Sequence, residues 1–170
     1  MTIDLHRRPL LALYPNISGL CYAVFEAELK AVDWGIKTAR QAKHATLLRH
    51  ASRLMEIFGP ETIILPARKA VVRGSDRLRK IGYDIEQVAK VSGASVRAYT
   101  RSDIQSCFAR HGAASKDAIA RAIVRLLPEF EQHLPPPRKI WMSEDYRMGL
   151  FDAVALALTD NWAEGSGHTG

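Results

Sequence analysis

The sequence has little cysteine and no long apolar run. Its two cysteines, Cys21 and Cys107, are too few for a disulfide framework or a cysteine-rich zinc site, which favours a reducing compartment. No apolar stretch approaches the roughly 18 residues that a membrane span requires. Residues 1–9 also lack the apolar segment of a secretory signal. We therefore expect a cytoplasmic protein that makes no contact with membranes.

Acidic residues are outnumbered by basic ones. The 170 residues, enough for one domain with its own core, include 24 Lys and Arg against 18 Asp and Glu, which gives a net charge of +6. This surplus suits a polyanionic partner such as nucleic acid, although many basic domains bind nothing of that kind. Trp34, Trp141 and Trp162 are not interleaved with basic residues, so no platform for stacking single strands is predicted.

The order of apolar patterns predicts an α/β fold. Three β-rich runs with short links, Leu10–Tyr14, Leu20–Phe25 and Leu29–Ile36, are typical of an antiparallel meander. Helical stripes then alternate with two further strands, Thr62–Leu65 and Ser95–Tyr99. We expect a mixed five-stranded sheet, antiparallel at one edge and parallel through the middle, flanked by helices.

The expected helices are bounded by caps and breakers. They span residues 37–58, 75–93, 103–110 and 115–127, with Ser115 as the cap of the last, and a small strand is expected at 139–142. A closing helix at Met148–Thr159 is apolar on every face and should be buried. We divide the chain into an arm (1–8), one domain (9–160) and a disordered tail (161–170).

The closing helix contains one acid, Asp152. A carboxylate inside so apolar a helix is costly unless it is paired, hydrogen-bonded or bound to metal. One interpretation is that Asp152 only caps a backbone group at the edge of the helix. The other is that Asp152 belongs to a functional site.

Three segments carry a family resemblance. They are LALYPNISGLCYAVFE near the start, TRSDIQSCFARHGAASKDAI in the middle and FDAVALALT near the end. In this order they resemble the first hairpin, the glycine-bearing loop with its lysine, and the last helix of the RuvC-type Holliday junction resolvases. The resemblance implies an RNase H-like fold over residues 9–160, a homodimer, and branched DNA as partner.

The resemblance also implies a site where four carboxylates hold two divalent metal ions. The resemblance places three of the four positions at Tyr14, on or next to Leu65, and at Gly149, and only the fourth, Asp152, is an acid. One carboxylate does not supply the oxygen ligands that two Mg²⁺ ions require. We therefore expect a DNA-binding pseudoenzyme of this family that needs no metal cofactor, with Asp152 as the one retained catalytic or metal-binding position.

Basic residues are the candidates for phosphate contacts. Lys116 corresponds to the family's phosphate-contacting lysine and lies at an expected helix N-terminus, close to Arg110. Arg68, Lys69 and Arg73 follow the expected central strand. The alternative for all of them is an ordinary solvated surface.

Two other functions stay open at this point. An active Mg²⁺-dependent endonuclease could have rebuilt its site from Asp152, Asp145 or Glu144, and Asp33. A protein-interaction module could instead use the Pro135–Pro137 segment for docking.

Overall fold

The computed structural model describes residues 8–39, 43–67 and 76–166. Within these ranges the elements run in the order β1 (Leu10–Asn16), β2 (Gly19–Glu26), η1 (Ala27–Leu29), β3 (Lys30–Thr38), α1 (His44–Phe58), β4 (Thr62–Pro66), α2 (Asp76–Val91), β5 (Ser95–Tyr99), α3 (Arg101–Ala109), α4 (Lys116–Leu126), η4 (Pro128–His133) and α5 (Met148–Ser166). No helix among these residues is both long and apolar enough to cross a lipid bilayer.

The five strands form one mixed sheet in the order β3-β2-β1-β4-β5. β2 pairs antiparallel with both β1 and β3, whereas β1 pairs parallel with β4 and β4 pairs parallel with β5. The predicted α/β fold, with its antiparallel edge and parallel centre, is confirmed. Because β1, β4 and β5 run in the same direction, their carboxyl ends meet at one edge of the sheet.

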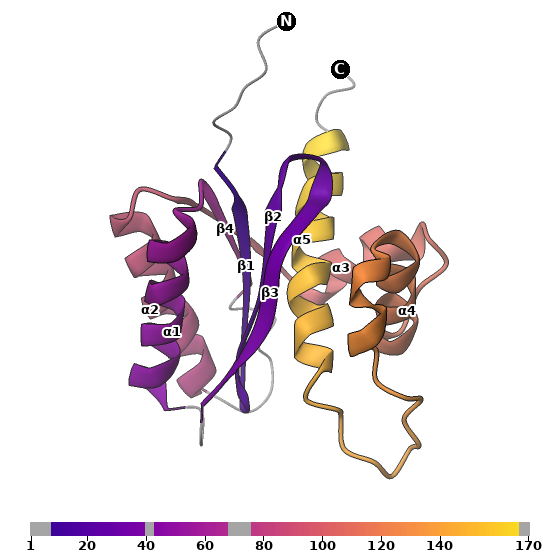
Figure 1. The fold of residues 1–170 in the computed structure, drawn as a ribbon. Helices are drawn as coiled ribbons and strands as arrows, with labels where there is room; N and C mark the ends of the chain where they lie inside the picture. The colour runs from indigo at the N-terminus through magenta and orange to yellow at the C-terminus, as the bar shows by residue number, and fades with distance from the viewer. Residues whose placement is uncertain (1–7, 40–42, 68–75, 167–170) are drawn as a thin grey trace, which may run out of the picture.

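Helices cover both faces of this sheet (Figure 1). α1 and α2 pack on one face, and α5 lies on the other with α3 and α4 outside it. Side chains of β1 alternate between the two cores: Leu11 and Leu13 face α1 and α2, and Ala12 faces α5. Burial on both faces explains why β1, β2 and β4 read as nearly continuous apolar runs.

α5 is the buried closing helix that the sequence predicted. Every residue from Ala153 to Asp160 is buried between the sheet and the outer helices. The helix continues to Ser166, so the predicted disordered tail is wrong for residues 161–166, while 167–170 lie outside the described ranges. The extra turn is held because Trp162 packs on the ring of Phe108 and Glu164 pairs with Arg97.

Two other expected boundaries differ from the structure. α1 begins at His44 rather than at residue 37, because Lys37 and Thr38 complete the pairing of β3 with Leu20 and Gly19 of β2. Residues 139–142 form a turn, closed by the amide of Met142 donating to the carbonyl of Lys139, and not the small strand that we expected. Of the predicted arm, residues 1–7 lie outside the described ranges.

Candidate functional site

A cavity of about 790 Å³ lies where the parallel strands end. Tyr14 of β1, Pro66 of β4 and Tyr99 of β5 line it, together with residues of α2, α3, α4 and α5. Open α/β sheets bind ligands outside the carboxyl ends of their strands, where loops and helix N-termini converge. We call this space the strand-end cavity.

Two helices begin at the strand-end cavity with capped N-termini. Thr100 and Asp103 form a reciprocal capping box at the start of α3, and the Ser115 side chain accepts from the amide of Ala118 at the start of α4. The predicted cap at Ser115 is therefore confirmed. These caps place Arg101 and Lys116, the first residues of the two helices, on the cavity wall.

Lys116 lies between two carboxylates. Its Nζ atom is 2.7 Å from Oε1 of Glu144, in the loop before α5, and 3.3 Å from Oδ2 of Asp152. The Asp152 side chain is only 17% exposed, while the side chain of Glu144 is 46% exposed. Lys116 was predicted to face phosphate, and Asp152 was predicted to be the one remaining metal ligand; the structure pairs the two with each other.

Burial controls the protonation of this pair. Desolvation raises the pKa of Asp152 to about 6, although the Lys116 ammonium opposes this shift. Burial also lowers the pKa of Lys116, but the two carboxylates outweigh that effect and hold it above its ordinary value. At pH 7 the cavity therefore contains a permanent ammonium beside a carboxylate that is mostly ionised.

Tyr14 takes the place of the first expected acid. Burial, followed by the charge of Asp152, raises the pKa of its hydroxyl to about 12, so the phenol stays neutral at physiological pH. A neutral phenol is a poor ligand for a hard divalent cation. Leu65, at the second expected position, is an apolar core residue and is 4% exposed.

Gly149 lies where no side chain fits. A Cβ atom there would be 2.5 Å from Sγ of Cys21 and 2.6 Å from Nδ2 of Asn16. The Asn16 side chain is held in place because its Oδ1 accepts from the amides of Ser18 and Gly19 in the β1–β2 turn. An acid at position 149 would therefore require the hairpin to rearrange.

These residues do not fit a pair of divalent metal ions. No group of three or more acidic, histidine or cysteine side chains comes together within residues 8–39, 43–67 and 76–166 in a way that could hold a metal. Two acids that could have rebuilt a metal site with Asp152 are paired with cations of the chain: Glu144 contacts Lys116, and Asp145 makes a double contact with Arg147 at 2.7 and 2.9 Å. Asp33 accepts from the hydroxyl of Tyr22 on the β2–β3 edge.

Of the other predicted phosphate contacts, only Arg110 belongs to the described residues, and it does not line the strand-end cavity. Arg110 lines a separate cavity of about 300 Å³ beside His111 and Trp162. Arg68, Lys69 and Arg73 lie outside the described residues. Arg101 does line the strand-end cavity, and sequence reasoning missed it. Its position directly after the expected strand Ser95–Tyr99 was the available signal, because the carboxyl ends of parallel strands point to the site.

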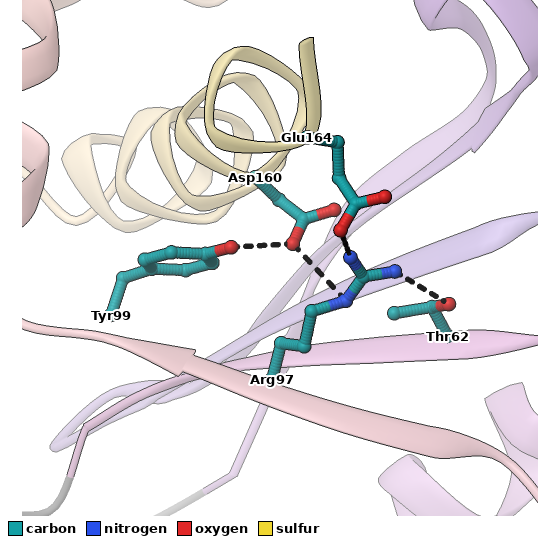
Figure 2. A network of polar contacts seen from close by, with 5 residues as sticks. All are labelled: Thr62, Arg97, Tyr99, Asp160 and Glu164. Atoms are coloured by element: carbon teal, nitrogen blue, oxygen red, sulfur yellow. Dashed lines mark hydrogen bonds and ion pairs between the residues drawn. The ribbon is translucent and has the colours of Figure 1, made fainter. Parts of the chain in front are cut away.

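A second buried acid, Asp160, was also missed. Its Oδ1 accepts from the hydroxyl of Tyr99 at 2.6 Å and lies 3.3 Å from Nε of Arg97, two contacts drawn as dashed lines in Figure 2. Arg97 also reaches Glu164 and, at 3.3 Å, the hydroxyl of Thr62. This network joins the second half of α5 to β4 and β5. Because Tyr99 also lines the strand-end cavity, the network fixes one wall of that cavity.

Comparison with known proteins identifies the fold of this chain. The sequence matches no protein-family model and no curated protein. Among solved structures, RuvC from Thermus thermophilus is similar with a TM-score of 0.66 at 21% identity, covering 94% of this chain and 96% of that one. The same protein in complex with a Holliday junction substrate is similar with a TM-score of 0.61 at 17% identity and the same coverage. The chain therefore has an RNase H-like fold that matches the fold of RuvC.

Proposed function

We propose that this chain binds branched or duplex DNA at the strand-end cavity and does not cleave it by a two-metal route. The observation that carries the proposal is the position of the Lys116 ammonium against Asp152 and Glu144. A metal site would have to form around Asp152 and Glu144. The ammonium of Lys116, a cation of the chain itself, already lies between these two carboxylates. The cavity can thus keep a positive group for phosphate without recruiting a metal ion.

Several features of the cavity support phosphate as the ligand. Two helix N-termini open into it, where the helix dipole favours anions. Arg101 adds a guanidinium on the same wall. The chain carries a net charge of +6, and a RuvC with the same fold binds a Holliday junction.

In this proposal Lys116 exchanges Glu144 for phosphate. The Glu144 side chain is the more exposed of its two partners and belongs to a loop, whereas Asp152 is held inside α5. A phosphate oxygen would replace the Glu144 carboxylate while the contact with Asp152 remains. Glu144 is then a competitor of DNA, and its charge weakens binding.

Equilibrium binding of duplex and four-way-junction DNA over a series of salt concentrations tests the proposal. Lys116→Gln should weaken binding by about tenfold and reduce the slope of log affinity against log salt by about one. Glu144→Gln should strengthen binding severalfold. Arg121→Gln is the matched control, because Arg121 lies on the same helix in an exposed pair with Asp117. Replacing EDTA by Mg²⁺ at equal ionic strength should not increase affinity.

An active nuclease is the second candidate, and one observation favours it. Glu144 and Asp152 both contact a single ammonium, so they are close enough to share one divalent ion if Lys116 moves away. Cleavage of junction DNA that requires Mg²⁺ or Mn²⁺ and is abolished by Asp152→Asn would establish this function and contradict the binding-only proposal. A chain that neither binds nor cleaves DNA would contradict both and favour an interaction module.

A further inference from the structure

An apolar tip projects from the loop between η4 and α5. Ile140, Trp141 and Met142 are 97%, 79% and 49% exposed, although such large side chains are normally covered. The three residues lie in a turn that is closed by the amide of Met142 donating to the carbonyl of Lys139. We call residues 140–142 the apolar tip.

The apolar tip belongs to the same end of the molecule as the strand-end cavity. Its loop leads directly into α5, and Glu144, two residues after the tip, contacts Lys116 on the cavity wall. In Figure 1 the loop extends in orange beyond the first turn of α5, at the end where β1 turns into β2. We therefore expect a long ligand seated at the cavity to reach this loop.

Positive charge accompanies the tip. Arg138 and Lys139 are exposed and precede it directly, and the Lys139 ammonium lies 5.3 Å from the centre of the Trp141 ring. An exposed aromatic face beside two cations is the arrangement that binds a nucleic-acid base together with its phosphates. The sequence pattern had predicted no stacking platform at the tryptophans. The turn at 139–142 places Lys139 over one face of the Trp141 ring, while the side chain stays 79% exposed and open to a base.

The size of the tip favours a base over a protein partner. A stable protein interface takes about 20 to 30 residues a side, and the tip offers three. A base offers a flat face of the same size as an indole ring. In a duplex these faces are stacked on one another, whereas unpaired bases at a branch point, flap or mismatch are free to stack on Trp141.

We propose that Trp141 stacks on an unpaired base of branched DNA while Arg138 and Lys139 contact the neighbouring phosphates. This inference rests on the proposed DNA binding and adds a preference to it: the strand-end cavity holds backbone phosphates of any duplex, and the apolar tip selects DNA with unpaired bases.

The experiment uses the full chain, with 2-aminopurine as the unpaired base in a flapped duplex and a fully paired duplex as reference. Trp141→Ala should weaken binding to the flapped DNA about tenfold and leave duplex affinity unchanged. It should also abolish the change in 2-aminopurine fluorescence at saturating protein. Trp141→Phe should retain both, because it keeps an aromatic face. Val91→Ala is the control, since Val91 is 89% exposed at the end of α2.

Failure of this inference differs from failure of the function on which it rests. If wild-type protein binds neither DNA, the proposed function is wrong and the inference falls with it. If both DNAs bind and Trp141→Ala leaves the preference and the fluorescence unchanged, the inference alone is wrong. Loss of self-association in Trp141→Ala, measured by sedimentation, would identify the tip as a contact between copies and would likewise overturn it.

Discussion

Nζ of Lys116 lies 3.3 Å from Oδ2 of Asp152, across the boundary between α4 and the buried closing helix α5. This ion pair joins two residues that the sequence assigned to separate tasks, phosphate contact and metal binding. The candidate site therefore contains a positive and a negative charge in direct contact. Its energetics give the first two predictions.

Removal of the Lys116 charge should destabilise the fold. Lys116→Met leaves the largely buried Asp152 carboxylate without its cation, which should lower the free energy of unfolding by about 1 to 2 kcal/mol at pH 8. Arg121→Met, which breaks the exposed pair with Asp117 on the same helix, should cost less than about 0.5 kcal/mol. Urea unfolding of both variants measures this difference. Equal losses in the two variants would contradict it.

The raised pKa of Asp152 predicts a specific dependence on pH. Its pKa is about 6 in the folded protein against 3.8 for a freely solvated aspartate, so between these values the folded state holds a proton that the unfolded state has released. The contribution of Asp152 to the free energy of unfolding is greatest below pH 4 and falls as pH rises to about 6, by up to about 3 kcal/mol. Above pH 7 it is constant.

Asp152→Asn isolates this effect from other titrating groups. The stability of wild type minus that of the variant should decrease from pH 4 to pH 7 in urea titrations and then level off. A difference that increases with pH would mean that the carboxylate is stabilised by its surroundings, and our account of its burial would be wrong.

Two glycines in helices should respond to alanine in opposite ways. Gly149→Ala forces a Cβ atom against Cys21 and Asn16, so we expect a loss of about 1 to 3 kcal/mol despite the better helix propensity of alanine. Gly82→Ala, in α2, meets nothing within 4 Å and should stabilise the protein by about 0.5 to 1 kcal/mol. Thermal unfolding compares the two variants. A stabilising effect of Gly149→Ala would show that the β1–β2 turn adjusts to the added Cβ atom at little cost in free energy.

The buried contacts of Asp160 should contribute far more to stability than the exposed contact of Glu164. Asp160→Ala removes a buried acceptor from the Tyr99 hydroxyl and from Arg97, for which we expect a loss of about 2 to 4 kcal/mol. Glu164→Ala removes only the 60% exposed partner of Arg97 and should cost less than about 1 kcal/mol. Denaturant unfolding of the two variants tests this order, and the reverse order would contradict the importance of the buried contact.

Local patterns in the sequence were enough for the fold. The apolar runs in β1 and β2 predicted strands, the run in β4 predicted a strand covered on both faces, and the apolar closing helix predicted the buried α5. The cap at Ser115 followed from one residue and its position. These features depend on neighbours along the chain, which is why they can be read without coordinates.

The site was predicted only as separate residues. The sequence placed Asp152 on a buried helix and Lys116 at a helix start, but their contact arises because α4 and α5 pack side by side in the fold. Glu144 and Asp145 are adjacent in sequence and yet bind different cations, since the path of the loop turns one toward α4 and the other toward Arg147. The spacing of these residues in the sequence does not indicate which cation each acid contacts.

The order of residues was sufficient to predict that one acid remains where the resemblance implies four, and that the closing helix is buried. The pairing of that acid with Lys116, and the close contacts of Gly149 with Cys21 and Asn16, followed only from the folded arrangement. The physical reason is that composition sets which charges exist, whereas the packing of distant elements sets which of them meet.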